Sequence, residues 1–262
     1  HGIRLRLMDY IYGFVLTALL VYNNSLVLLG PTAWGTGLGA RRAVAVAVAA
    51  QLLGTYTSTL SQIRVGTPEF LYVAALYVLL SLAKISLPIS VLSYSIHSPR
   101  PEVFALWMAS PATSLLTYPL CKVLRGGTAL SALSLFVAMY AFGYNNIAIF
   151  AYNPLTTAAA VVLGTYFGAG LSRWVLEIAA LRPRTTAAIN LTVATAALIG
   201  TIFATPMSFT LVAYSAMLVA SYSQQIRVIK IEKFAKAYLG ILIAVAASLI
   251  FPALKPLLAP PA

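Results

Sequence analysis

Side chains that build catalytic or metal sites are scarce in this sequence. Its 262 residues include five acidic residues, two histidines and one cysteine. The single cysteine, Cys121, excludes an internal disulfide and a cysteine-ligated metal cluster. His1 and His97 lie at the terminus and in a serine-rich turn, which argues against a histidine-ligated metal. Because no nucleophile, acid–base pair or redox centre can be assembled from these residues, we expect neither an enzyme nor a bound cofactor.

Apolar residues dominate what is present. Hydrophobic residues make up 61% of the chain, charged residues make up 8%, and the mean hydropathy is +0.90. This composition is too apolar for a soluble domain of such length. We therefore predict an all-α polytopic membrane protein, whose partner is the lipid bilayer, located in the plasma membrane.

Nine apolar segments are each long enough to cross about 30 Å of hydrocarbon. They cover residues 10–30, 42–62, 70–95, 103–122, 128–151, 154–172, 186–204, 206–222 and 235–258. Glycine or proline is expected to end or bend several of them, with Gly30-Pro31 ending the first. The other expected breaks are Pro88, Pro111, Pro119, Asn153-Pro154 and Pro206. About 9–10 membrane segments are expected, some of them broken helices or re-entrant hairpins.

Basic residues outnumber acidic residues by 17 to 5. Because they lie mostly in short connections between apolar segments, we attribute them to cytoplasmic loops and expect no nucleic-acid partner. The clusters that this rule places inside are Arg4 with Arg6, Lys122 with Arg125, Arg173 with Arg182 and Arg184, and residues 227–236. Nine full spans would leave Arg41 and Arg42 outside, so at least one segment is expected to be a re-entrant hairpin.

A pair of asparagines occurs twice within apolar segments. The first copy is Tyr22-Asn23-Asn24, and the second is Tyr144-Asn145-Asn146. A carboxamide costs free energy at membrane depth unless it finds partners, so the recurrence indicates a polar site between two halves. Taken singly, each asparagine is equally well explained by a hydrogen bond to a neighbouring helix.

A proline followed two residues later by a serine also recurs. Leu87-Pro88-Ile89-Ser90 lies about 65 residues after the first asparagine pair, and Thr205-Pro206-Met207-Ser208 lies about 61 residues after the second. Two ordered features at similar spacing predict an internal repeat, with units at 1–125 and 126–262 in one integrated membrane domain. The hydroxyls could equally satisfy carbonyls that the prolines leave free.

This order of motifs resembles the inorganic phosphate transporter (PiT) family of sodium- or proton-coupled phosphate symporters. Each half of that family carries a Gly-Ala-Asn-Asp-x-Ala-Asn-Ala signature and, later, Leu-Pro-Val-Ser-Thr-Thr-His. Here residues 21–31 and 143–154 stand at the first signature, and residues 87–94 and 205–212 stand at the second. Residues 39–43 and Ser110-Pro111 resemble flanking elements of the family, so the resemblance covers nearly the whole chain.

The resemblance implies two repeats of inverted topology around a site near the middle of the membrane. It implies a secondary transporter that moves inorganic phosphate, or a similar tetrahedral oxyanion, by alternating access. The residues that it assigns to the substrate are Asn23, Asn24, Ser90, Asn145, Asn146, Ser208 and Thr210. The charge pattern alone runs both asparagine segments in the same direction, and one re-entrant segment is enough to reverse one of them.

The chain lacks ionisable residues that the family motifs contain. Asn24 and Asn146 stand where the family has an acidic residue, and Ser93 and Leu211 stand where its hairpins have histidine. The usual ligands and proton carriers for coupling to Na⁺ or H⁺ are therefore missing, and the coupling ion is left open. Uncharged amides and hydroxyls at broken-helix N-termini still suit an anion. Lys84 either neutralises that anion or extends to the membrane interface.

A second interpretation is a non-transporting membrane subunit or scaffold that retains the transporter fold. It differs from the first in whether the polar site still binds a substrate, and a homo-oligomer is compatible with both. Two further features of the sequence are expected to have structural roles and no contact with a substrate. Gln51 is expected to bind a neighbouring helix, and the glycine-rich residues 35–39 are expected to form a tight loop.

Overall fold

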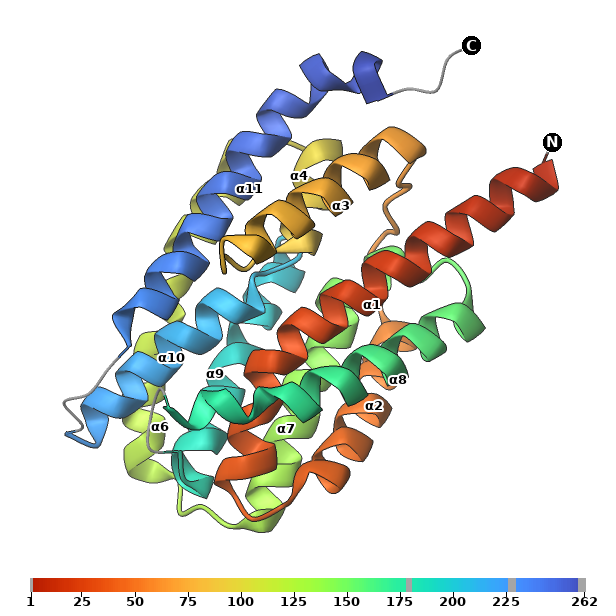
Figure 1. Cartoon of the computed structure of the whole chain (residues 1–262). Helices are drawn as coiled ribbons and strands as arrows, with labels where there is room; N and C mark the ends of the chain where they lie inside the picture. Colours follow the sequence, from red (N-terminus) through yellow and green to blue (C-terminus); the bar gives the residue numbers. More distant parts are fainter. Residues whose placement is uncertain (1, 178–180, 226–229, 259–262) are drawn as a thin grey trace.

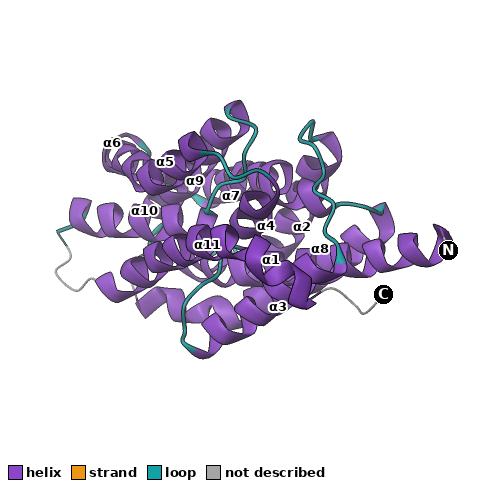
Figure 2. Ribbon diagram, turned by 90° about the horizontal axis from the view of Figure 1, so that it is seen from above, coloured by secondary structure: helices purple, strands orange, loops and turns teal. Residues whose placement is uncertain are grey.

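A computed structural model of the chain describes residues 2–177, 181–225 and 230–258, and over these residues it is built from helices (Figure 1). The α-helices are α1 (Gly2–Gly35), α2 (Ala40–Thr57), α3 (Thr67–Leu82), α4 (Ile89–His97), α5 (Pro101–Ala109), α6 (Thr117–Val123), α7 (Thr128–Phe142), α8 (Pro154–Leu171), α9 (Pro183–Ile202), α10 (Phe209–Ser223) and α11 (Ile231–Leu258). The shorter 3-10 and π elements are η1 (Ser110–Leu116), η2 (Gly143–Ile147), η3 (Ala148–Phe150) and η4 (Ser172–Glu177). Figure 2 shows the helices joined by loops, and the longest connection, residues 58–66, links α2 to α3.

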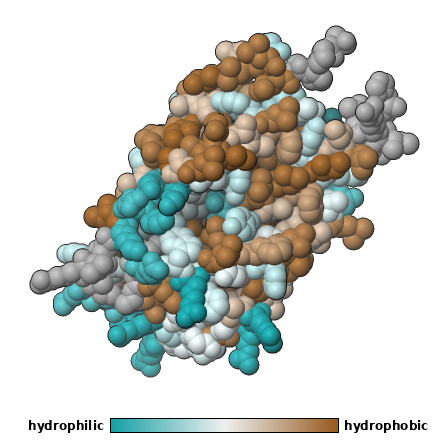
Figure 3. Space-filling view, viewed as in Figure 1, coloured by the Kyte–Doolittle hydropathy of each residue, from teal (hydrophilic) through white to brown (hydrophobic). Residues whose placement is uncertain are grey.

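Five helical stretches are long and apolar enough to cross a membrane. They are Leu7–Gly35, Thr128–Phe150, Pro154–Glu177, Pro183–Ile202 and Ile231–Leu258. The chain is therefore a multi-pass integral membrane protein, and the all-helical part of the predicted fold class is confirmed. The face drawn in Figure 3 carries broad hydrophobic areas over its upper part, as a lipid-facing surface does.

Several expected breaks are found, but the first is not. Asn153 caps α8 by accepting hydrogen bonds from the amides of Leu155 (3.0 Å) and Thr156 (3.1 Å). The prediction that Gly30-Pro31 ends the first segment is wrong, because α1 continues to Gly35 with Pro31 inside it. Proline removes one helical hydrogen bond, and close packing against a neighbour can hold the helix together despite that loss. Gly30 provides such packing, since a Cβ there would lie 2.6 Å from the carbonyl oxygen of Ser172.

Four connections meet at one end of the bundle, which we call the basic end. Trp34 Nε1, near the end of α1, donates to Ser172 Oγ at 3.1 Å, and Lys230, before α11, pairs with Glu177 at 3.1 Å. Gly126 lies against Arg184 at the start of α9. The basic residues of these connections are Arg41, Arg42, Lys122, Arg125, Arg173, Arg182, Arg184 and Lys230. Hydrophilic groups gather towards the lower left and bottom of Figure 3, where Figure 1 shows these connections.

Two predicted charge placements change as a result. Arg41 and Arg42 begin α2 at the basic end, alongside the other clusters, and not on the opposite side. Arg4 and Arg6 belong to the first turns of α1, at the far end of that 34-residue helix (Figure 1). The count of nine complete spans fails because residues 70–95, counted as one span, form the two helices α3 and α4, which turn back within the bundle as the expected re-entrant hairpin would.

These two helical pairs form hairpins that start from different ends. α3 and α4 start and finish at the end opposite the basic end, where the His97 ring bonds the Arg64 carbonyl (2.6 Å) and Glu69 pairs with Lys255 (3.0 Å). α9 starts at the basic end, and after α10 the chain resumes there at Lys230. We call α3–α4 the first hairpin and α9–α10 the second hairpin; their turns are residues 83–88 and 203–208.

The two turns have the same backbone hydrogen bonds. The bonds are Ile85 N to Leu80 O (2.8 Å) and Lys84 N to Ser81 O (3.0 Å) in the first turn, and Thr205 N to Gly200 O (2.9 Å) and Ala204 N to Thr201 O (3.0 Å) in the second. This is the Schellman ending of a helix, and it places Lys84 and Ala204 in the left-handed region at φ of 58° and 50°. The backbone thus pairs Ser90 with Thr210 and Pro88 with Ser208. An alignment of the sequence motifs, which pairs Pro88 with Pro206, differs from this pairing by two residues.

Packing of the first turn on α11 is testable at Gly240. A methyl group there would collide with the carbonyl oxygen of Ser86, whereas a methyl group at Gly170 on α8 would meet no atom within 4 Å. We expect Gly240→Ala to lower the free energy of unfolding by about 1–3 kcal/mol through overpacking. Gly170→Ala should be neutral or stabilising, because alanine favours helices. Thermal unfolding in detergent measures both, and equal stability of the two variants would contradict the packing.

Candidate functional site

The second asparagine pair lies in a local widening of the helix that follows α7. Residues 143–147 form the π-helical turn η2, a feature that often occurs at functional sites. Gly143 makes this turn compatible with close packing, because a Cβ there would collide with the backbone of Gln51 on α2. Gln51 itself donates to Thr165 Oγ1 on α8 at 3.0 Å, which confirms its expected role between helices.

Asn145 holds the turn of the second hairpin. Its Nδ2 donates to the Thr205 carbonyl at 3.0 Å and to Thr201 Oγ1 at 3.2 Å, and its Oδ1 accepts from the Met207 amide at 2.8 Å. Asn145 is fully buried. Because a carbonyl only accepts and an amide N–H only donates, these partners fix the orientation of the side chain. Asn145 thus satisfies backbone groups that a turn at membrane depth would otherwise leave free.

Asn146 and Trp107 complete the support of this turn. Asn146 Nδ2 donates to the Met207 carbonyl at 2.8 Å and to Ser90 Oγ at 2.6 Å, and Trp107 Nε1 donates to the Pro206 carbonyl at 2.7 Å. Asn146 Oδ1 is buried and has no hydrogen-bond partner among the described residues. A buried acceptor without a donor costs about 1–3 kcal/mol, so this oxygen calls for an explanation.

The first asparagine pair makes related but fewer contacts. On α1, Asn23 Nδ2 donates to Ser86 Oγ, in the first turn, at 2.9 Å. Asn24 Nδ2 donates to the Leu20 carbonyl at 2.9 Å, and its Oδ1 accepts from Thr210 Oγ1 at 3.2 Å. Each pair therefore bonds one hairpin through its first asparagine and reaches the other through its second, and Asn146 bonds the second hairpin as well.

Six of the seven predicted site residues line one small cavity. Its volume is about 10 Å³, room for about one water molecule. The residues around it are Leu20, Asn23, Asn24, Pro88, Ser90, Asn146, Met207, Ser208, Phe209 and Thr210. Asn145 is the predicted site residue that is not among them, because its side chain is engaged with the turn of the second hairpin. In this conformation a tetrahedral oxyanion needs the surrounding helices to separate before it can enter.

Two helix N-termini border this cavity. Ser90 lies in the first turn of α4, and Thr210 lies in the first turn of α10. α4 begins without a side-chain cap, whereas Ser208 Oγ accepts from the Leu211 amide at 3.4 Å to cap α10. First-turn amides and the positive ends of the helix dipoles favour an anion. None of the described residues that line the cavity carries a charge.

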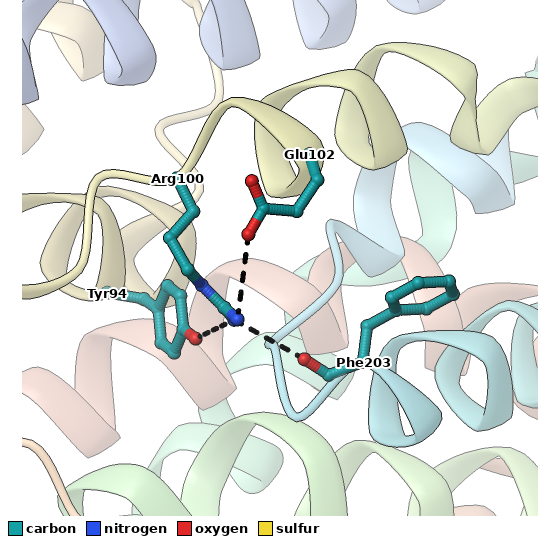
Figure 4. Close-up of polar contacts among 4 residues, drawn as sticks. All are labelled: Tyr94, Arg100, Glu102 and Phe203. Carbon is teal, nitrogen blue, oxygen red and sulfur yellow. Dashed lines mark hydrogen bonds and ion pairs between the residues drawn. The ribbon is translucent and has the colours of Figure 1, made fainter.

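Arg100 joins the exit of the first hairpin to the turn of the second (Figure 4). Its Nη2 donates to Tyr94 Oη at 2.6 Å and to the Phe203 carbonyl at 3.4 Å, while Nη1 lies 3.9 Å from Glu102 Oε1. Phe203 is the C-cap of α9, whose carbonyl end favours a cation. The guanidinium thus stabilises the C-terminal end of α9, at the turn of the second hairpin, and does not reach the cavity.

Sequence reasoning missed Trp107 and Arg100 and left Lys84 undecided. Trp107 is fully buried within an apolar segment, and nothing in the sequence distinguishes it from packing residues. The position of Arg100 before Pro101 does not indicate that its guanidinium bonds the Phe203 carbonyl, 103 residues away. Lys84 is exposed at the first turn and does not line the cavity, which favours an interfacial role over direct contact with an anion.

Comparison of the chain with known protein families, curated proteins and solved structures found no match.

Asn23 and Asn145, the first asparagine of each pair, should contribute unequally to the stability of the protein. Asn145→Ala removes the partners of the Thr205 carbonyl and the Met207 amide, so we expect a loss of about 2–4 kcal/mol, whereas Asn23→Ala breaks one half-buried contact and should cost about 1 kcal/mol. Thermal unfolding of the purified variants compares them. Hydrogen exchange at Met207 gives a local readout and should accelerate only in Asn145→Ala. Equal losses in both variants would show that Asn145 does not support the turn.

Proposed function

We propose that this protein is a secondary transporter, and not an enzyme, that moves inorganic phosphate or a similar tetrahedral oxyanion by alternating access. The observation that carries the proposal is the uncharged cavity between the N-termini of α4 and α10, bordered by Asn24 and Asn146. Donors without competing carboxylates suit an anion. The resemblance of the motifs to the PiT family supports the same assignment.

The arrangement of the helices supports an inverted repeat, as we propose for the units 1–125 and 126–262. α1 runs towards the basic end and α7 away from it, and the two hairpins enter from opposite ends. Corresponding hydrogen bonds recur 120 residues apart in the turns. Transporters built on inverted repeats bind substrate near the midplane, where broken helices meet. The basic end then faces the cytoplasm, with the chain in the plasma membrane.

The unpaired oxygen of Asn146 supports phosphate over sulfate. Its Nδ2 must face the Met207 carbonyl, so its Oδ1 is fixed as an acceptor that lacks a donor. Phosphate at neutral pH carries a P–OH group that can donate to this oxygen, whereas sulfate carries none. Ser90 Oγ already accepts from Asn146 and keeps its own hydrogen for a phosphate oxygen. The site thus offers both an acceptor and donors to a protonated oxyanion.

Opening of the cavity is assigned to the first hairpin. Among the described residues, one side-chain hydrogen bond from outside reaches the turn at 83–88, whereas five reach the turn at 203–208. Elements with fewer buried contacts open at lower free energy. Asn23, Asn24 and Ser90 would then separate from the more firmly held Asn146 to admit the substrate. Coupling to Na⁺ or H⁺ is an open part of the proposal.

One observation favours the alternative of a non-transporting subunit that retains the transporter fold. The cavity of about 10 Å³ is too small for an oxyanion in this conformation. A chain locked in this conformation would serve as a scaffold, alone or as a homo-oligomer.

Labelled phosphate uptake into proteoliposomes tests the proposal. We expect uptake by the wild-type chain, measured with and without Na⁺ and pH gradients, and inhibition by arsenate but not by sulfate. Asn146→Ala should reduce uptake at least tenfold, because a hydrogen bond to a charged group is worth about 1.5–3 kcal/mol. Asn146→Asp should also reduce uptake, because aspartate has no Nδ2 group to donate to the Met207 carbonyl.

Ser221→Ala is a matched control, since Ser221 is buried and its hydroxyl finds no hydrogen-bond partner in the described part of the chain, but it lies outside the cavity. Its uptake should equal that of the wild type. Absence of phosphate uptake and of phosphate binding under every gradient would reject the transporter and favour the scaffold. Equal inhibition by sulfate would reject the role given to Asn146 Oδ1.

A further inference from the structure

A second hollow lies on the outside of the bundle at the basic end. It is a groove of about 530 Å³ between the start of α2 and the end of α8. Its walls are mostly apolar, and Phe167 and Leu171 expose 58% and 60% of their surface there. Arg41 lies on the same groove, and Arg42 follows it in the sequence. The groove thus combines an apolar channel with positive charge where α2 begins.

The start of α2 is electrostatically unfavourable as it stands. The first turn of this 18-residue helix contains Arg41 and Arg42 and no acidic residue, and Gly39 provides no side-chain cap. Cations at a helix N-terminus oppose the helix dipole, and the first-turn amides lack intrahelical acceptors. A bound anion would relieve both effects, since it would neutralise the arginines and accept from the amides.

Gly170 keeps the groove open. A Cβ at this position would meet no atom within 4 Å, although neighbouring Ala169 is buried against the bundle. α8 belongs to one of the five stretches that are long and apolar enough to span a membrane. In a membrane, the space beside Gly170, near the end of α8, would therefore face acyl chains close to the surface. An apolar space at that level accommodates the upper part of an acyl chain.

We propose that this groove binds an anionic phospholipid, with its phosphate at Arg41 and the N-terminus of α2 and with an acyl chain along Phe167, Gly170 and Leu171. The shape and the charge both fit this occupant, because a free anion leaves the apolar walls uncovered and a neutral lipid leaves the arginines uncompensated. Anionic lipids are enriched in the cytoplasmic leaflet, which is the leaflet that the basic end contacts when basic loops face the cytoplasm. The site is separate from the central cavity, so it does not depend on phosphate transport.

Native mass spectrometry of the full chain tests this site, with phosphatidylglycerol and phosphatidylcholine titrated separately. We expect the wild type to retain phosphatidylglycerol preferentially. Arg41→Gln should lower that affinity about fivefold, the effect of one basic residue near the membrane surface. Gly170→Leu should fill the groove and lower retention by a similar factor, since a Cβ there meets no described atom within 4 Å.

Two matched variants distinguish the groove from a general effect of charge or bulk. Arg125→Gln removes an exposed charge at the same end, and Ala159→Leu adds bulk to an exposed position of α8 outside the groove. Both should bind phosphatidylglycerol as the wild type does. Equal losses in Arg41→Gln and Arg125→Gln would overturn the proposal. Full displacement of the lipid by inorganic phosphate would also overturn the proposal, because the occupant would then be a free anion. A dimer that Gly170→Leu dissociates, and that phosphatidylglycerol leaves unchanged, would overturn it as well, because the groove would then be an interface between two copies of the chain.

Discussion

The structure depends on satisfying backbone groups where helices break inside a membrane protein. In the second turn, the carbonyls of Thr205, Pro206 and Met207 accept hydrogen bonds from Asn145, Trp107 and Asn146, respectively. Without such donors an irregular turn at this depth would carry several unsatisfied groups, each costing several kcal/mol in hydrocarbon. The asparagines are thus required by the fold before any ligand is considered. Asn146 Oδ1 is an acceptor for which the described residues supply no donor, and the proposed preference for phosphate over sulfate rests on that oxygen.

Support and binding are divided within each asparagine pair. Asn23 and Asn145 each bond a hairpin turn, and Asn24 and Asn146 line the cavity between α4 and α10, although Asn23 also lines the cavity and Asn146 also bonds the second turn. The residues that would touch substrate are therefore oriented by neighbours in the same helices. Among the described residues, the first turn receives fewer side-chain hydrogen bonds from outside than the second, which is why we propose that the first hairpin opens. The groove proposed to bind lipid lies at the surface of the bundle, and the proposal applies the same electrostatic rule, an anion at a helix N-terminus, to a different helix.

The sequence predicted the parts of this arrangement that depend on composition and local breaks. Apolar runs identified the helical segments, and Pro88 and Asn153-Pro154 lie at real breaks. The recurring motifs predicted that Asn146 and Ser90 belong to one site, and they are 2.6 Å apart. Other features depend on tertiary contacts that a linear pattern does not contain. Pro31 stays within α1 because of packing at Gly30, and Trp107 acts as a donor only because α5 lies beside the second turn.

The central claim is that the cavity opens to bind a protonated oxyanion between the two hairpins. Anomalous diffraction from crystals of the full chain grown with arsenate tests it most directly, because arsenate shares the shape and protonation of phosphate and its position can be measured. The account predicts an arsenic peak with oxygens within hydrogen-bond distance of Asn146 Oδ1 and Ser90 Oγ, and displacement of the first hairpin. A saturated arsenate site elsewhere, or an unchanged cavity at saturating arsenate, would contradict it.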